Sequence, residues 1–371
     1  LQLFFYGLGT IIGAGFYALL GKIAGEAGYY APTSFFLSSF IALFTALSYC
    51  ELSARYPYSG GEAYYVHEAY RKKGLTALVG WLVILTGLVS AATLTSAISG
   101  FMKDLIDIPY HLNLILCVAF LGGIGIWGIG KSTLFVVIIT CLEVGLLLLI
   151  LWYSKDNVGL AFIHIDKFIP PLEGVALTGV MSAAVLAFYA FIGFEDMVNL
   201  SEEVKDVRKA MPKAILLSLI VATLLYMLVS MAALITVTPE ELNAANTPMT
   251  ILLPSISPIF IGIISILAAS NGALVQIVMT ARVAYGMANT GTISPFFNKV
   301  NEETQTPVNA TLFMMALILL LAFFFPLQDL AKITSSILLG VFFFINMALL
   351  KMKANPNKFK LKKGITSYPR W

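Results

Sequence analysis

Two glycine-containing interruptions of long apolar segments could free backbone groups to bind a charged solute. The first lies at Gly13 and Gly15, and the second at Gly193, which Glu195 and Asp196 follow closely. Glycine in a helix interior costs about 1 kcal/mol relative to alanine, so these positions favour local unwinding. Unwinding offers N–H groups to a carboxylate and carbonyl groups to an ammonium, which suits a zwitterionic amino acid. The alternative is that the glycines only let helices pack closely.

Two acidic residues are candidates for coupling. Glu143 stands near the middle of the apolar run 133–153, where a charged carboxylate costs about 2.5–3.5 kcal/mol on insertion scales. It could be a proton-coupling acid, a counter-charge for a cationic substrate, or a structural carboxyl hydrogen-bonded between helices. Glu195 is the second candidate because it adjoins the second interruption. Sodium stays open as a coupling ion: Ser265 and Ser270 could supply oxygens, although serines within a span more often bond their own helix.

The composition requires a membrane environment for these segments. The chain has 371 residues, of which 59% are hydrophobic and 12% charged, whereas a soluble domain carries about 25% charged residues. A membrane-spanning helix needs about 20 mostly apolar residues. On that criterion the sequence predicts an all-α polytopic membrane protein with ten spans: 2–23, 32–54, 75–101, 112–130, 133–153, 174–200, 213–237, 256–288, 308–326 and 330–350.

The basic residues predict the orientation of these spans. With the N-terminus in the cytoplasm, 18 of the 23 Lys and Arg residues fall on the cytoplasmic side, as the positive-inside rule requires. We therefore expect a multi-pass protein of the cell membrane with its N-terminus and C-terminal tail in the cytoplasm. The basic balance is explained by topology, so no nucleic-acid partner is inferred. The first residue is Leu1 and an apolar run begins at once, which predicts that further residues precede it.

The two interruptions are five spans apart, each in the first span of one half of the chain. Five is odd, so the second half enters the membrane with the opposite polarity. This arrangement is typical of inverted-repeat secondary transporters, whose site lies between two broken helices. The expected division is a first repeat at 1–153, an extracellular connection at 154–173, an inverted second repeat at 174–350 and a basic cytoplasmic tail at 351–371.

Motifs along nearly the whole chain resemble those of the amino acid–polyamine–organocation (APC) transporter family. The first-helix run Thr10-Ile11-Ile12-Gly13-Ala14-Gly15-Phe16 is similar to the family's Ile-Ile-Gly-small-Gly signature. The other similar runs, in chain order, are 51–57 with 60–64, 188–195, 202–206, 271–276 with 282 and 285–287, and 306–308 with 330–331. The resemblance implies the five-plus-five inverted repeat of the bacterial leucine transporter, with helices 1 and 6 broken.

The resemblance also implies roles for individual residues. A substrate carboxylate would meet N–H groups around Ile12, Gly13, Ala14 and Gly15. Its ammonium would meet carbonyl groups at Ile11, Tyr189, Ala190 and Ile192, and the ring of Tyr189 or Phe191 would close over it. At the position of Glu143 several relatives carry a lysine thought to take the place of a sodium ion, and glutamate reverses that sign. Relatives commonly have about twelve spans, whereas this chain stops about where an eleventh would begin.

The expected function is proton-coupled transport of an amino acid by alternating access. The first alternative is an exchanger, or a carrier of polyamines or other organic cations, and the second is an amino acid sensor that does not transport. No enzyme, cofactor or metal site is predicted, because the three histidines and three cysteines are scattered. The run 125–132 matches the phosphate-loop pattern, but it ends an apolar segment of spanning length, so its glycines are interpreted as a helix-packing face.

Overall fold

The computed structural model describes residues 2–56, 61–106, 108–127, 133–171, 174–201, 204–289, 291, 293–301, 303–304 and 306–355. These residues form helices and connections, with no strand among them. Each predicted apolar segment is helical over most of its described length. The first-half helices are α1 (Gln2–Ile11), α2 (Ala14–Ala27), α3 (Ala31–Arg55), α4 (Gly61–Tyr70), α5 (Lys73–Leu105), α6 (Tyr110–Trp127), α7 (Thr133–Tyr153) and α8 (Lys155–Ile163).

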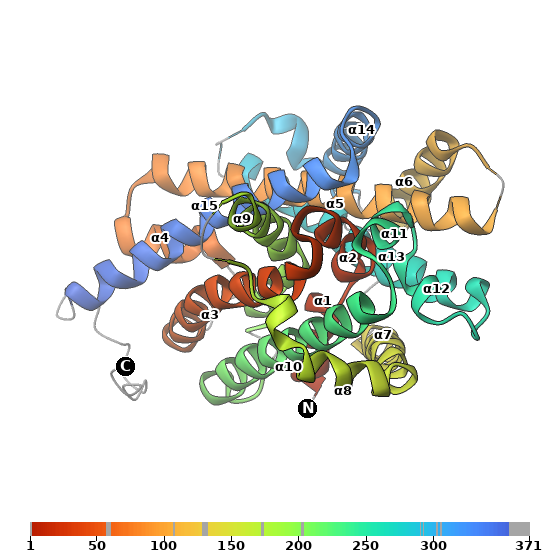
Figure 1. The fold of residues 1–371 in the computed structure, drawn as a ribbon. Helices are drawn as coiled ribbons and strands as arrows, with labels where there is room; N and C mark the ends of the chain where they lie inside the picture. Colours follow the sequence, from red (N-terminus) through yellow and green to blue (C-terminus); the bar gives the residue numbers. More distant parts are fainter. Residues whose placement is uncertain are drawn as a thin grey trace.

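The second half continues the helical arrangement. Its helices are α9 (Val175–Phe188), α10 (Val207–Thr236), α11 (Pro239–Ala244), α12 (Pro248–Leu252), α13 (Pro258–Asn289), α14 (Val308–Phe324) and α15 (Leu327–Ala354). Figure 1 shows α1 and α2 near the middle of the molecule, with α3, α5, α9 and α10 around them. The chain packs α5 along α13 and α15, and α3 along α10.

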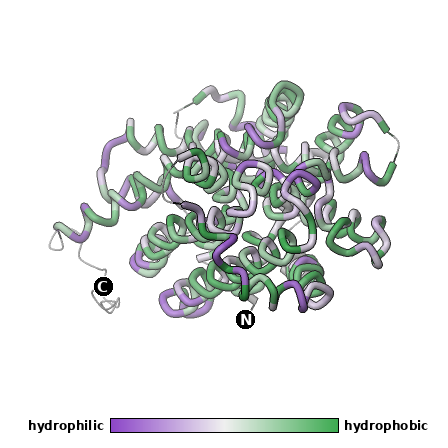
Figure 2. Tube along the Cα trace, viewed as in Figure 1, coloured by the Kyte–Doolittle hydropathy of each residue, from purple (hydrophilic) through white to green (hydrophobic). Residues whose placement is uncertain are grey.

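Length and hydropathy mark this as a multi-pass membrane protein. Seven helical stretches of the described chain could cross a membrane, or eight if α7 and α8, bent by 70° at their junction, count as one span. One stretch, Leu3–Arg55, has 53 residues and covers two predicted spans, while α14 is apolar but shorter than the length required. Figure 2 shows apolar residues along most of the helices. Large exposed apolar side chains such as Phe120, Trp127 and Phe324 suit contact with lipid.

Short helices in the connections were missed by the sequence analysis, although α11 has a recognisable start. Thr238 Oγ1 accepts the N–H of Glu241, and the Glu241 carboxylate accepts the N–H of Thr238, which is a capping box. The helix packs against α2, where a methyl group added at Gly21 would overlap the carbonyl of Leu242. The connection after α10 therefore packs against α2 through α11.

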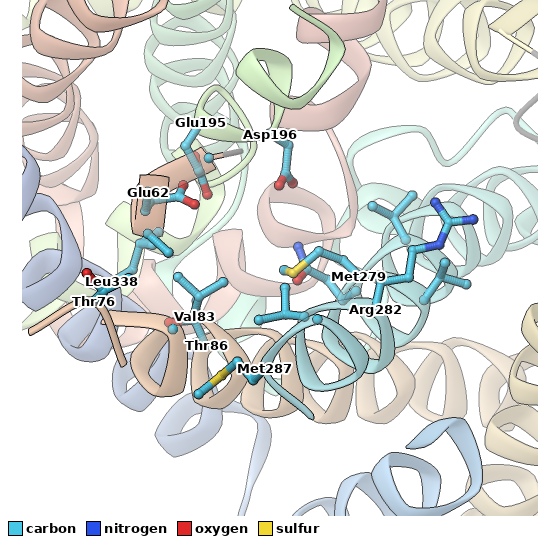
Figure 3. Close-up of a pocket in the computed structure, with 18 of the residues that line it drawn as sticks. Glu62, Thr76, Val83, Thr86, Glu195, Asp196, Met279, Arg282, Met287 and Leu338 are labelled. Carbon is cyan, nitrogen blue, oxygen red and sulfur yellow. The ribbon is translucent and has the colours of Figure 1, made fainter. Parts of the chain in front are cut away.

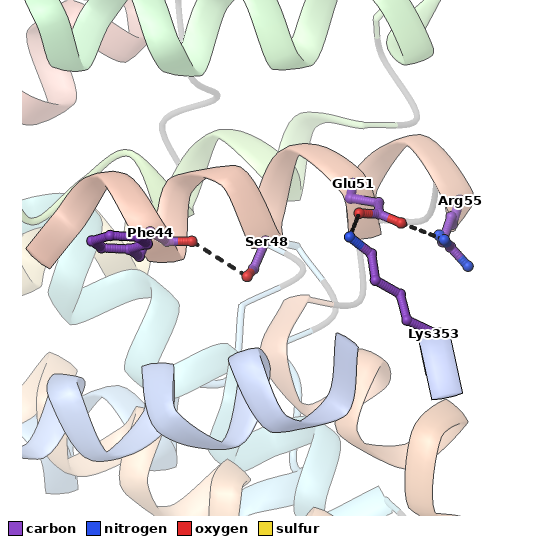
Figure 4. Close-up of polar contacts among 5 residues, drawn as sticks. All are labelled: Phe44, Ser48, Glu51, Arg55 and Lys353. Carbon is purple, nitrogen blue, oxygen red and sulfur yellow. Dashed lines mark hydrogen bonds and ion pairs between the residues drawn. The ribbon is translucent and has the colours of Figure 1, made fainter. Parts of the chain in front are cut away.

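Ionic contacts tie the end of α15 to the end of α3. Glu51 accepts from Arg55 one turn later on α3, and its other oxygen lies 2.6 Å from Lys353 Nζ (Figure 4). Ser48, on the same helix, donates to the carbonyl of Phe44. The predicted basic tail begins within α15, and its residues 356–371 lie outside the described residues.

Part of the phosphate-loop match, residues 128–132, also lies outside the described residues. Its first glycine, Gly125, belongs to α6, and a methyl group there would lie 3.3 Å from the side chain of Val278 on α13. For that glycine, the expected packing role agrees with the structure.

Candidate functional site

The two glycine interruptions lie in direct contact. Helix α1 ends at Ile11 and α2 begins at Ala14, with Gly13 extended between them (φ −126°, ψ −160°). Helix α9 ends at Phe188 and is followed by 3-10 turns at Tyr189–Phe191 and Glu195–Leu200. A methyl group at Gly193 would overlap the carbonyl oxygen of Thr10, and one at Gly15 would lie 3.1 Å from Ala190 Cα. The fold thus joins two segments nearly 180 residues apart.

The N–H groups expected to meet a carboxylate fall into two pairs. Those of Ile12 and Gly13 donate to the carbonyls of Leu8 and Ile11 at 2.7 and 2.9 Å. Those of Ala14 and Gly15 belong to the first turn of α2, where helix geometry provides no intrahelical acceptor. The positive end of the α2 dipole also lies there. In this conformation Ala14 and Gly15 are therefore the better placed pair for an anion.

Tyr226 of α10, which the sequence analysis missed, bridges the two interruptions. Its hydroxyl lies 2.8 Å from the Ile11 carbonyl oxygen and 3.1 Å from that of Ala190, so two predicted ammonium ligands share its proton. A third predicted ligand, the carbonyl of Tyr189, accepts the N–H of Ile192 at 3.2 Å. A tyrosine in an apolar helix carries no sequence signal for such a contact, because the partners are carbonyls of distant segments.

A cluster of aromatic rings packs beside the contact. The Tyr226 ring stacks on Phe16 with a centroid separation of 4.2 Å, and Phe191 meets it at 5.3 Å. Phe35 of α3 completes the cluster, which is fully buried. Of the two rings expected to close over a substrate, Phe191 belongs to this cluster. The Tyr189 hydroxyl instead lies 3.0 Å from Ser90 Oγ of α5.

Two cavities adjoin the interruptions. A small cavity of about 60 Å3 is lined by residues of both interruptions, including Ile11, Gly13, Gly15 and Tyr189. A larger cavity of about 830 Å3, which we call the vestibule, is lined mainly by α4, the first part of α5 and the second part of α13 (Figure 3). Four residues line both cavities and define the neck between them: Ile192, Asp196, Val275 and Gln276.

Acidic side chains gather on one wall of the vestibule. Glu195 is 5% exposed, and one of its carboxylate oxygens accepts the N–H of Gly193 at 2.9 Å. Figure 3 shows its carboxylate near that of Glu62 from α4, with Asp196 on the same side of the cavity. Glu62 accepts the hydroxyl of Tyr49 at 2.9 Å. The predicted candidate Glu195 therefore lines the vestibule.

The titration of Glu62 gives a stability prediction. Burial raises the pKa of the Glu62 carboxyl above its ordinary value of 4.5, although the hydrogen bond from Tyr49 acts in the other direction. The folded protein thus holds this proton more tightly than the unfolded chain, and stability falls as pH rises through the raised pKa. We expect Glu62→Gln to raise the thermal midpoint in detergent by an amount that grows from pH 4.5 to 8. A difference in thermal midpoint between Glu62→Gln and the wild type that stays constant across that pH range would contradict this expectation.

Glu143 lies outside both cavities. It is 1% exposed, and neither carboxylate oxygen has a hydrogen-bond partner within the described part of the chain. Its backbone carbonyl accepts the hydroxyl of Tyr17 from α2 at 2.7 Å. Helix α7 packs closely on α1, where a methyl group at Gly9 would overlap the side chain of Thr140. Glu143 therefore lies where α7 packs against α1 and α2, and not in the wall of either cavity.

The described residues hold no group of three or more His, Cys, Asp or Glu side chains suited to a metal. Ser265, one of the two serines considered for sodium, donates to the carbonyl of Ile261 within its own helix at 3.0 Å. That contact is the ordinary one for a serine in an apolar helix.

Comparison with known proteins identifies the family. A family model described as "Amino acid permease" matches residues 1–370. The chain is 30% identical to the branched-chain amino acid permease BcaP of Bacillus subtilis, over 95% of this chain and 81% of that protein. It is 27% identical to cationic amino acid transporter 3, mitochondrial, of Arabidopsis thaliana, over 93% of this chain and 60% of that protein. It is 25% identical to the methylthioribose transporter of B. subtilis, over 95% and 80% of the two chains. With apolar helices suited to a membrane and this match over almost its full length, the chain belongs to the amino acid permeases of the amino acid–polyamine–organocation superfamily.

Proposed function

We propose that this protein is a secondary active transporter that moves an amino acid across the cell membrane by alternating access. The observation that carries the proposal is the contact of the two interruptions around a small cavity that continues into the vestibule. The buried aromatic cluster of Phe16, Phe35, Phe191 and Tyr226 packs beside this contact, and in the proposal it closes one side of the site. A site reachable from one side and sealed from the other is what a carrier needs in each half of its cycle.

The proposed architecture has ten spans in two inverted repeats, 1–153 and 174–350, with the interruptions as broken helices 1 and 6. Both ends of the chain are cytoplasmic in this proposal. The second predicted span then ends in the cytoplasm, so α4 and the start of α5, which line the vestibule, lie on that side. The vestibule therefore opens to the cytoplasm. The opposite orientation of the two halves is supported by the offset from the span of Gly13 to the span of Gly193, which is five predicted spans and therefore odd.

The proposed substrate contacts are with backbone. Its carboxylate binds the N–H groups at the start of α2, chiefly those of Ala14 and Gly15, where the helix dipole adds to the attraction. Its ammonium binds the carbonyls of Ile11 and Ala190 by replacing the hydroxyl proton of Tyr226. The named substrates of the relatives include branched-chain and cationic amino acids and methylthioribose, so these compounds form the test panel.

The decisive experiment is uptake of labelled compounds from that panel into proteoliposomes, with and without an inward proton gradient at fixed sodium. Gradient-stimulated uptake supports a proton symporter. Uptake that needs preloaded internal amino acid makes the protein an exchanger. Binding without flux for every compound would overturn the transport proposal and leave a sensor.

Removing the hydroxyl that bridges the interruptions should strengthen substrate binding, because the ammonium no longer has to displace it. Tyr226→Phe keeps the ring on Phe16 and leaves the Ile11 and Ala190 carbonyls without their shared donor. Losing these buried hydrogen bonds destabilises the substrate-free state by about 1 kcal/mol or more, so we expect the half-saturating concentration to fall about fivefold to tenfold. Tyr17→Phe is the matched control, since it removes a buried hydroxyl that donates to the Glu143 carbonyl. Equal effects of the two changes would argue against a special role for Tyr226.

A further inference from the structure

A polar contact joins three helices at the end of the molecule away from the vestibule. Lys332 Nζ of α15 lies 2.6 Å from one carboxylate oxygen of Glu26, at the end of α2. The other oxygen of Glu26 accepts the hydroxyl of Ser182 from α9 at 2.8 Å, and Lys332 also donates to that hydroxyl at 3.1 Å. We call these three residues the clasp. Each member contacts both others, so the contact links α2, α9 and α15.

The position of the clasp follows from the course of α2. The helix starts at the first interruption and runs 14 residues to its end, about 20 Å at 1.5 Å per residue. Gly15, Ala18, Lys22 and Glu26 are spaced three or four residues apart, so they share one face of the helix. Gly15 lines the small cavity. The clasp therefore lies about three turns beyond that cavity, along the same face and on the side opposite the neck.

The elements around the clasp meet closely. A methyl group at Gly179 of α9 would lie 2.8 Å from the carbonyl oxygen of Glu26, so no side chain separates the two helices there. On another side α2 is covered by α11 at Gly21 and Gly25. At the far end of α5, Asp104 accepts hydrogen bonds from Asn246 and Thr247, next to α11, both at 2.8 Å. These contacts hold the described helices together at the end of the molecule away from the vestibule.

The strength of the clasp suits a contact that forms and breaks. The side chains of Lys332 and Glu26 are 31% and 22% exposed, and ion pairs of such exposure shift an equilibrium by about fivefold at most. The hydrogen-bonded part of the contact is short-ranged, since it is lost once the donor and acceptor atoms separate beyond hydrogen-bond distance.

We propose that Glu26, Ser182 and Lys332 are positioning residues of the transport cycle that hold this end shut while the vestibule is open. Release of the clasp lets the end of α2 separate from α9 and α15 and opens a second route to the small cavity. By the predicted topology this route leads to the extracellular side. The inference rests on the proposed transport function, because a shut end matters only to a protein that opens its two ends in turn.

The test measures access to the shut end without measuring transport. Ala18 is 5% exposed and lies on the α2 face between the small cavity and the clasp. Ala18→Cys is introduced into a protein whose Cys50, Cys117 and Cys141 are replaced by alanine. A membrane-impermeant maleimide is then applied to proteoliposomes from the side opposite the vestibule. We expect Glu26→Gln and Lys332→Met each to increase the rate of labelling about threefold to fivefold.

Two further variants separate a clasp from general loosening. Lys353→Met removes a lysine of the same helix from an ion pair of the same length, at the other end of the molecule, and should leave labelling unchanged. The exchanged pair Glu26→Lys with Lys332→Glu should restore protection. Unchanged labelling in both single variants, an equal rise in Lys353→Met, or no rescue by the exchanged pair would overturn the proposal. Failure of the transport proposal would be seen separately, as absence of flux in the unmodified protein.

Discussion

Replacing Gly193 by alanine is expected to abolish transport, with uptake below about 1% of the wild-type rate. Gly193 has a φ of +127°, in a region that other residues adopt at a cost of order 1–3 kcal/mol. The added methyl group would also overlap the carbonyl oxygen of Thr10. The two interruptions would be pushed apart at the point where they form the small cavity. Uptake measures the loss of transport, and the thermal midpoint in detergent measures the loss of stability caused by the backbone strain and the overlap.

Two other glycines provide the comparison. Gly340 lies in α15 with no neighbouring atom within 4 Å of an added methyl group, so Gly340→Ala should be neutral or stabilise the helix by about 0.5–1 kcal/mol. The uptake rate of Gly15→Ala should lie between those of Gly193→Ala and Gly340→Ala, because its methyl group would be 3.1 Å from Ala190 Cα and 3.2 Å from the ring of Tyr189. Wild-type uptake by Gly193→Ala would contradict the assigned contact between the interruptions.

Glu143→Gln is expected to remove the response to a proton gradient while exchange of internal for external substrate continues. An ionised carboxylate without a partner is costly to bury, and Glu143 has none for either oxygen within the described part of the chain. Glutamine preserves the shape of the uncharged acid and cannot carry a proton. A gradient of one pH unit drives about a tenfold accumulation per coupled proton, and this accumulation should disappear in the variant.

The matched comparison uses two other acids. Glu240→Gln changes an exposed carboxyl of α11 and should keep the full accumulation. Glu195→Gln tests the second candidate, which lines the vestibule. If Glu195→Gln loses the response to the gradient and Glu143→Gln keeps it, the coupling role belongs to the acid beside the second interruption and Glu143 has a structural role.

Much of the fold could be predicted from the sequence because long apolar runs identify membrane helices. All ten predicted segments are helical over most of their described length. The two interruptions could also be located, since Gly13, Gly15 and Gly193 weaken a helix locally whatever surrounds them. The short helices α4, α8, α11 and α12 were missed, because they lack the length that identifies a span.

The chemistry of the site was only partly predictable. Backbone roles at Ile11 and Ala190 are implied by the family resemblance and stay predictions, whereas their shared partner, Tyr226, lies more than 30 residues from either one. Glu143 was noticed for its charge, yet the sequence could not place it behind α1, because the packing of α7 depends on Gly9 and Thr140 meeting across two helices. Contacts such as these depend on three-dimensional packing, which no periodicity encodes.

The unequal sizes of the two cavities bear on how this protein could be inhibited. The vestibule, at about 830 Å3, is in the range of pockets that hold drug-sized molecules, whereas the small cavity beyond the neck holds about 60 Å3. A compound that carries an amino acid head group on a bulky extension could place the head at the interruptions and leave the extension in the vestibule. Such a compound would block the site without being transported. It would inhibit only when supplied from the side to which the vestibule opens.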